Sequence, residues 1–343
     1  MARRIFTIVV ALVTSASTIS FVFDSRAAAQ PLGYFSDVRP VAGLEGPWRD
    51  ESPWVSDDGL RMYFNSERPN VGSNIQTDKR DIWMATRDST SSAFDDFTKI
   101  ESVSVDGASD HYPFLYDDEL RLHFTSDRDG GATTYVSTRA TRNDDWSAPE
   151  AIALGLAAPP DSRAAGIRFT DDRLTAVFSG SVGANGTNSD LFIATRESVD
   201  DSFGAPLPIT DVNAANREDW HPYITGNGLA LFYSRAEPGY LRPDIYVSIR
   251  SSTSQDFGTP QRLELAFPGS DNLHFQAATF DPFLTTDWPK SGSKIYFTSA
   301  NSSADFDIYE ATWTTVPEPA ALGMITVLIF VLSSMRPHPS SKA

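Results

Sequence analysis

One pattern of apolar and polar residues occurs five times along this chain and constrains its fold more than any other feature. Each copy has an apolar strand, a polar turn and a second strand with alternating apolar residues, as Leu60, Met62 and Phe64 show in the first copy. Alternation with a period of two is typical of a β-strand with one buried face. The sequence therefore predicts a repeat protein built from strands.

Two further strands are expected after each hairpin. The third strand contains apolar runs such as Ile82-Trp83-Met84. The fourth carries an aromatic residue followed at +3 and +6 by apolar residues or proline, a residue that suits an outer edge strand. Its members are Phe94, Phe97 and Ile100; Trp146, Pro149 and Ile152; Phe203, Pro206 and Ile209; and Phe257, Pro260 and Leu263. Four strands repeated about every 55 residues predict the blades of a β-propeller.

The fifth copy ends at Trp313 without its fourth strand, and the missing pattern occurs near the N-terminus as Phe35, Val38 and Val41. We therefore expect an all-β, five-bladed β-propeller that an N-terminal strand closes. An open β-solenoid or a sandwich is the alternative, but neither explains an odd strand at the N-terminus. The predicted propeller spans residues 33–314. Its blades are expected at 48–104, 108–156, 160–212, 216–267 and 272–314, and 33–44 completes the last of them.

Several strings within these copies resemble the WD40-like PD40 repeats found in TolB and in many exported bacterial propellers. They are Trp54-Val55-Ser56-Asp57-Asp58-Gly59-Leu60, Asp81-Ile82-Trp83, Trp146-Ser147-Ala148-Pro149 and Trp220-His221-Pro222-Tyr223-Ile224. The resemblance implies an architecture rather than an activity. TolB-type propellers usually have six blades, so a count of five departs from that pattern. The third copy also departs, because Gly166-Ile167-Arg168 replaces the proline-containing segment of the others.

Both ends of the chain differ from the repeats. Arg3 and Arg4 precede an apolar stretch over 5–23, and Ala27 to Ala29 supply small residues for cleavage after Ala29. This order predicts a signal peptide over 1–29 that signal peptidase removes; an uncleaved membrane anchor is the alternative.

The other end carries Pro317-Glu318-Pro319, an apolar run over 320–332 and then Arg336. Alone, this run is short for a membrane span and suits a buried helix or a lipid-interface segment equally well. The order of its parts resembles a PEP-CTERM sorting signal. The resemblance implies that 316–343 form a short hydrophobic helix, which the inner membrane holds until an exosortase-type machinery sorts the protein to the cell surface or extracellular matrix. A plain membrane anchor, which would keep the exported protein in the periplasm, is the alternative.

Composition excludes several kinds of site. The chain has no cysteine, which rules out disulfides and thiolate metal ligands. Its net charge of −17 should repel nucleic acid and anionic membranes. The sequence lacks a dinucleotide fingerprint and a phosphate-binding glycine loop, so we expect no cofactor. We also expect no metal site, since the Asp-Asp pairs at 57–58, 117–118 and 171–172 lie in turns where aspartate is favoured for backbone reasons.

The residues that precede each innermost strand are the candidate site, because innermost strands line the central channel. The candidate ligand-binding residues at this mouth are Trp48, His111, Tyr112, Arg163, Trp220, His221 and Gln276, and the candidate catalytic acids are Asp50, Glu51, Asp110 and Asp219. The acids recur at equivalent positions in the repeat, which favours a structural role in capping backbone N–H groups. His111 and His221 are interpreted as near-equivalent repeat positions, and Trp54 and Tyr223 as core residues.

The leading hypothesis is a binding or scaffold propeller with a protein or polysaccharide ligand. A glycan-active hydrolase of the five-bladed kind is the alternative, since two carboxyl groups suffice for glycoside hydrolysis. A component of an envelope complex, as TolB is, stands third. Fold alone does not choose among these.

Overall fold

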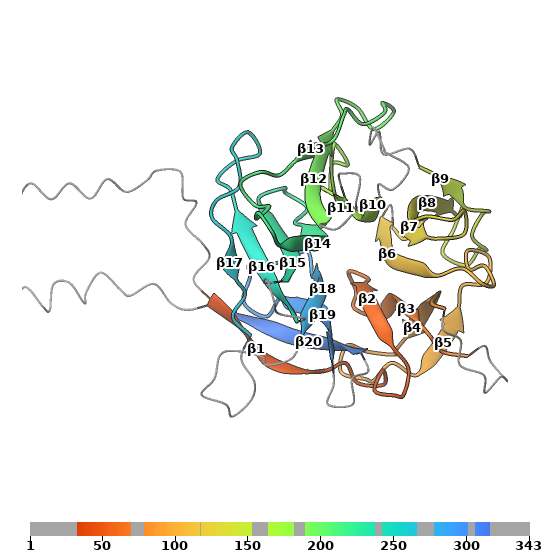
Figure 1. Cartoon of the computed structure of the whole chain (residues 1–343). Coiled ribbons are helices and arrows are strands. Elements are labelled where there is room, and N and C mark those ends of the chain that lie inside the picture. The colour runs from red at the N-terminus through yellow and green to blue at the C-terminus, as the bar shows by residue number, and fades with distance from the viewer. Residues whose placement is uncertain are drawn as a thin grey trace, which may run out of the picture.

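The computed structural model describes residues 33–69, 79–116, 118–152, 164–181, 189–236, 242–265, 278–300 and 306–315. Their twenty strands form five four-stranded sheets around one axis (Figure 1). The predicted all-β, five-bladed propeller is confirmed. A helix suited to crossing a membrane is not found in the described ranges. The predicted signal peptide and the C-terminal segment 316–343 lie outside those ranges.

Four sheets place their strands in the order of the chain from the axis outwards, and the fifth has β1 as its outermost strand. The first two blades contain β2 (Asp50–Val55), β3 (Arg61–Ser66), β4 (Asp81–Thr86) and β5 (Asp96–Lys99), then β6 (Asp110–Tyr116), β7 (Arg121–Ser126), β8 (Thr133–Thr138) and β9 (Glu150–Ala151). The next two contain β10 (Ala164–Phe169), β11 (Thr175–Ser181), β12 (Ser189–Thr195) and β13 (Leu207–Pro208), then β14 (Glu218–Ile224), β15 (Ala230–Ala236), β16 (Pro243–Ile249) and β17 (Gln261–Arg262). The fifth contains β18 (Thr279–Leu284), β19 (Lys294–Ala300), β20 (Phe306–Thr315) and β1 (Gly33–Pro40).

The fifth blade joins the two ends of the propeller. Strand β1 pairs antiparallel with β20, so that Phe35 lies opposite Trp313. The Val41 N–H then donates to the Ile308 carbonyl at 2.9 Å, and the Ile100 N–H makes the equivalent 2.9 Å bond to Ile82 in the first blade. Closure of the ring by the N-terminal strand is therefore confirmed.

The innermost strands share one irregularity. Each has a shift of register against its neighbour, and one residue of the bulge has a φ between 51° and 67°. These left-handed residues are Ser52, Tyr112, Gly166, His221 and Asp281. Proline follows four of them, which a bulge tolerates because it leaves a backbone N–H unpaired. The side chains at four of these positions contact one another across the blades, whereas Gly166 of the third blade has no side chain.

A second repeated contact links the turn between the first two strands of a blade to the outer strand of that blade. In four blades an arginine after the third strand lies over the aromatic residue that precedes the fourth strand, and its Nε donates to a carbonyl of the first turn. The pairs are Arg87–Phe94, Arg139–Trp146, Arg196–Phe203 and Arg250–Phe257, with the guanidinium carbon 4.4, 4.2, 4.5 and 4.4 Å from the ring centroid. The carbonyls belong to Gly59, Glu119, Arg173 and Gly228. In the fifth blade Trp313 replaces the arginine and packs edge-on against Phe35 at 4.9 Å.

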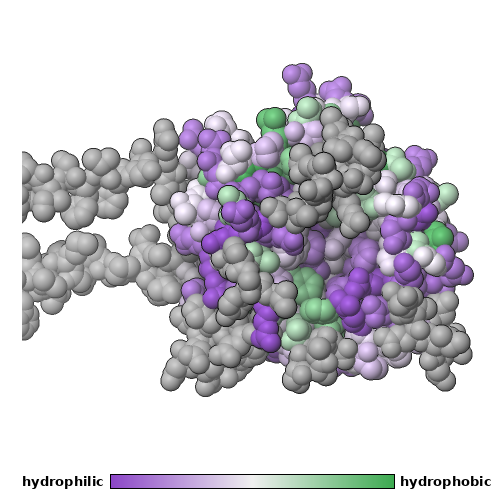
Figure 2. Space-filling view, viewed as in Figure 1, coloured by the Kyte–Doolittle hydropathy of each residue, from purple (hydrophilic) through white to green (hydrophobic). Residues whose placement is uncertain are grey.

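The described surface is largely polar. Among the described residues the large hydrophobic side chains that stay exposed are Val105, Val199 and Leu207. Hydrophilic residues accordingly dominate the coloured part of the face in Figure 2. Apolar side chains are thus concentrated within and between the blades.

Truncation of Phe35 should destabilise the fold through the closing strand. Its ring is fully buried, and replacing such a phenylalanine by alanine costs about 3–5 kcal/mol. We expect Phe35→Ala to lower the free energy of unfolding by about that amount in urea titrations. Leu207→Ala is the control, because Leu207 is 65% exposed and should change stability by less than about 0.5 kcal/mol. Equal effects of the two changes would show that closure does not depend on Phe35.

Candidate functional site

Three of the sequence-predicted acids are fully buried and paired with arginines of the same blade. The Arg68 Nη2 lies 2.5 Å from Asp50, and the Arg128 Nη2 lies 2.7 Å from Asp110. The Arg235 Nε donates to Asp219 at 2.6 Å. Burial raises the pKa of Asp50 to about 6, against the opposing effect of Arg68. These carboxylates join the start of each inner strand to the end of its second strand.

The remaining predicted residues that the structure describes also lie at or just before the starts of the inner strands. Glu51 is held by Arg49 at 2.9 Å and by Arg80 at 3.0 Å. Trp48, His111 and Trp220 are half-buried, whereas Arg163 and Gln276 lie outside the described residues.

The interpretation of His111 and His221 as equivalent is corrected by the bulge. His221 has the left-handed conformation of Tyr112, so His111 corresponds instead to Trp220.

The left-handed residues close the channel between its two ends. The Ser52 hydroxyl donates to Asp281 at 2.7 Å, and the His221 Nδ1 lies against the other oxygen of Asp281. The Tyr112 ring lies 4.5 Å from the His221 ring. Burial acts to raise the pKa of Asp281, but the charge and hydrogen bond of His221 and the bond from Ser52 hold that pKa below its usual value. Side chains of four blades thus form one contiguous layer across the axis.

A cavity of about 400 Å³ opens beyond this layer, at the ends of the inner strands rather than at their starts. Every blade contributes at least one aromatic side chain to its wall, and the second blade contributes two: Trp54, Phe114, Tyr116, Phe169, Tyr223 and Phe283. The Phe283 ring lies 6.0 Å from Trp54 and 5.4 Å from Tyr223. Trp54 and Tyr223 are buried, as expected from the sequence, yet both border the cavity. Cavities of this volume are typical of small-molecule sites.

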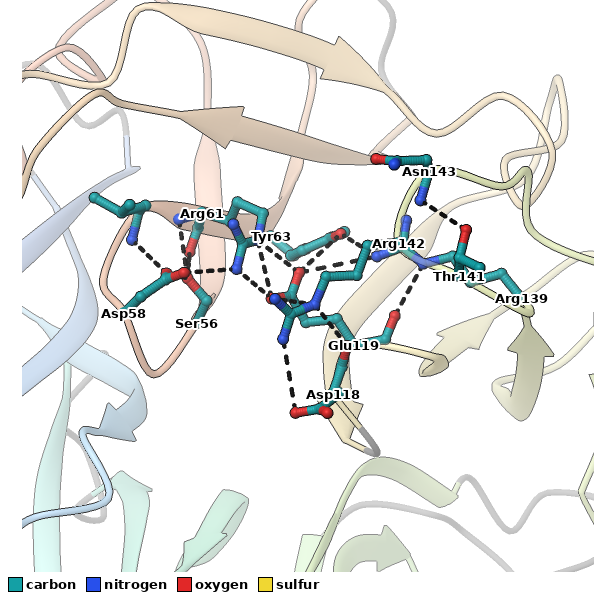
Figure 3. A network of polar contacts seen from close by, with 11 residues as sticks. Ser56, Asp58, Arg61, Tyr63, Asp118, Glu119, Arg139, Thr141, Arg142 and Asn143 are labelled. Atoms are coloured by element: carbon teal, nitrogen blue, oxygen red, sulfur yellow. Dashed lines mark hydrogen bonds and ion pairs between the residues drawn. The ribbon is translucent and has the colours of Figure 1, made fainter.

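The rim of the cavity contains a buried carboxylate bound by arginines, as Figure 3 shows. Glu119 is 3% exposed and accepts hydrogen bonds of 2.7–2.9 Å from Arg61. Arg142 and Arg139 lie 3.6 and 3.9 Å from the same carboxylate. Because Arg61 belongs to the first blade and the other three to the second, this cluster joins neighbouring blades at the mouth.

The second aspartate of each described Asp-Asp pair is bound to its own turn. Asp58 accepts bonds from the Ser56 hydroxyl at 2.6 Å and the Leu60 N–H at 3.0 Å. Asp172 accepts the same two kinds of bond in the third blade. The structural role predicted for these pairs therefore holds for their second members.

The first aspartate of each pair has a different environment. Asp57 and Asp171 line the cavity, and neither makes a side-chain hydrogen bond or ion pair within the described residues. Asp117, their counterpart in the second blade, lies outside those residues. Sequence reasoning missed this difference, although the spacing after Ser56 and Thr170 distinguishes the capping aspartate from its neighbour.

Asp57 and Asp171 line the same cavity and interact through their charges. Partial burial, and then the charges of Asp171 and of further acids, raise the pKa of Asp57. Burial, and then the charge of Asp171, raise the pKa of Tyr223, with a smaller contribution from Asp57. Both carboxylates therefore act on the same hydroxyl in the cavity wall. The described residues contain no group of three or more metal-ligating side chains suited to a metal ion.

Comparisons with known proteins identify the fold. No protein-family model matches the sequence, and no curated protein matches it. Among solved structures, it resembles the catalytic domain of a GH62 α-L-arabinofuranosidase from Coprinopsis cinerea (TM-score 0.55, 12% identity, 84% of this chain and 98% of that one). It also resembles an α-L-arabinofuranosidase from Lactobacillus brevis (0.55, 12%, 82% and 94%) and a putative TolB from Agrobacterium tumefaciens (0.43, 10%, 83% and 100%). At these identities the likeness shows a shared propeller fold alone.

Neutralising Glu119 should destabilise the rim of the cavity. Removing one partner of a buried ion cluster costs about 3–5 kcal/mol, because the remaining charges stay buried. We expect Glu119→Gln to lower the free energy of unfolding by about that amount in urea. The adjacent Asp118→Asn is the control, since its side chain is 91% exposed and such pairs contribute less than about 1 kcal/mol. A loss as small as that of the control would contradict this account of the cluster.

The buried His123 should make stability depend on pH. Its ring contacts Tyr116 and Phe169 of the cavity wall, and burial lowers its pKa from 6.5 to about 3. Because the folded pKa is depressed, the stabilising contribution is present above pH 6.5 and is lost as the pH falls towards 3. We expect this residue to account for about 2 kcal/mol of stability lost between pH 7 and pH 5. Urea titrations should show a correspondingly smaller loss for His123→Gln; an unchanged pH dependence would contradict the assignment.

Proposed function

We propose that this protein is an exported glycan-binding module that receives its ligand in the cavity at the ends of the inner strands. The observation that carries the proposal is the combination, in one cavity of about 400 Å³, of aromatic side chains from all five blades with two carboxylates that lack a partner among the described residues. Aromatic rings offer flat apolar faces to the C–H groups of a sugar, and carboxylates accept hydrogen bonds from its hydroxyls. A polar rim over an aromatic wall suits a sugar better than a purely apolar ligand.

Hydrolysis of a glycan is the second candidate function. Asp57 has a raised pKa and Asp171 is a second unpaired carboxylate at the same cavity, as a pair of acid and base would require. The acids Asp50, Asp110 and Asp219 suit this role less, because each is fully buried against an arginine. Release of reducing sugar that Asp57→Asn abolishes would favour the hydrolase over the binding module.

The cellular setting follows from the two ends of the sequence. A signal peptide over 1–29 and the Pro317-Glu318-Pro319 segment with its apolar run support export and sorting to the cell surface or matrix. Signal peptidase and an exosortase-type machinery would then be the processing partners. The inner membrane would hold 320–332 during sorting. A matrix location would bring the cavity into contact with polysaccharide.

A glycan panel with a cavity-blocking variant tests the proposed function. Thr286 is exposed and lines the cavity, so Thr286→Trp should fill its mouth without disturbing the core. In titration calorimetry with arabinan, neutral hexose and amino-sugar oligosaccharides, we expect at least one to bind and Thr286→Trp to weaken it at least about tenfold. Ser254→Trp is the control, because Ser254 is also exposed and does not line the cavity. Absence of binding across the panel, or equal binding by both variants, would overturn the proposal.

A further inference from the structure

The cavity lining has an excess of negative charge that its own arginines do not neutralise. The acids are Asp57, Asp58, Asp118, Glu119 and Asp171, and the bases are Arg61, Arg142 and Arg173. Arg61 binds Glu119 and Asp58, and Arg142 lies against Glu119 and Asp118. Arg173 lies over the Tyr116 ring at 5.5 Å. Among the acids of the described lining, Asp57 and Asp171 are the two that form no ion pair with an arginine or lysine.

These two carboxylates reach the cavity from different blades. Asp171 of the third blade extends over Gly226 of the fourth, and a Cβ at Gly226 would lie 2.1 Å from both of its carboxylate oxygens. A backbone hydrogen bond of 2.9 Å from Asp171 to the Gly226 carbonyl fixes this approach. Asp57 comes from the first blade, and both charges act on Tyr223. A ligand in the cavity would therefore meet both carboxylates beside an aromatic wall.

An aromatic wall next to unpaired carboxylates favours a cationic ligand over a neutral one. A cation over aromatic faces gains about 0.5–2 kcal/mol, and charge-assisted hydrogen bonds to carboxylates are roughly twice as strong as neutral ones. The net charge of −17 also attracts cations towards the protein. Aromatic side chains from every blade surround the cavity, which suits a ring-shaped ligand better than an extended side chain.

We infer that the cavity selects a glycan unit with a free protonated amine, that is, a de-N-acetylated amino sugar whose ammonium group binds between Asp57 and Asp171. This inference rests on the proposed function and names the class of glycan. Its N-acetylated counterpart has the same ring but neither the charge nor the ammonium donors. Discrimination between the two therefore depends on the two carboxylates.

A matched pair of ligands tests the inference on the purified protein. The probes are a β-1,4-linked glucosamine tetrasaccharide and the fully N-acetylated tetrasaccharide, titrated by calorimetry at low and high salt. We expect the amino form to bind at least about tenfold more tightly, and salt to weaken it. Asp57→Asn and Asp171→Asn should each reduce its affinity about ten- to a hundredfold. Asp172→Asn is the matched control, because Asp172 caps its own turn and does not line the cavity.

Each other outcome separates this inference from the function on which it rests. Equal binding of the two tetrasaccharides, with Thr286→Trp still blocking both, would overturn the inference and keep a glycan-binding cavity. The same follows if neutral oligosaccharides of the panel bind and the amino form does not. Tighter binding of hexalysine than of the amino sugar, lost in Asp57→Asn, would overturn the glycan in favour of a basic protein segment. Absence of binding by every glycan would remove the proposed function as well.

Discussion

The pairing of β1 with β20 is the interaction on which the ring depends. The chain has no cysteine, so no disulfide links β1 to the other strands of the fifth blade. Backbone hydrogen bonds and buried side chains hold the two ends together. Phe35 contributes most visibly, because it packs on Trp313 and its N–H also donates to Glu264 of the fourth blade at 3.3 Å. One N-terminal residue thus touches two blades, and the geometry of the central cavity follows from the ring that it closes.

Much of this architecture could be predicted from the sequence because it repeats. The +3 and +6 pattern of Phe35, Val38 and Val41 was sufficient to predict the closing strand, since the same pattern ends every other copy. Repetition also explains why the acids at the strand starts suggested a structural role. Each has an arginine 16 or 18 residues later, as Asp50 has Arg68, and this spacing was a usable signal.

The candidate site could not be predicted in the same way, because it depends on which end of the channel is open. A period of two assigns residues to faces of a strand, but the bulge at Ser52 shifts that assignment within the strand. Trp54 and Tyr223 therefore fit a core interpretation and still border a cavity. The layer formed by Ser52, Asp281 and His221 closes the channel through contacts between residues more than fifty positions apart, which no local pattern reveals.

In the turns at the cavity mouth, one residue stabilises the turn and the residue before it faces the cavity. In the first and third blades the second aspartate of the pair binds its own turn, while the side chain of the first aspartate binds nothing in its own blade. The fourth and fifth blades have Gly226 and Thr286 at the position of that first aspartate. Four such places among the described residues border a single opening, and the side chains of Asp57, Asp171 and Thr286 take no part in the bonds that hold their own loops. A scaffold of this kind can acquire new ligand preferences by point substitution, one blade at a time, while the folding information stays in the neighbouring residue.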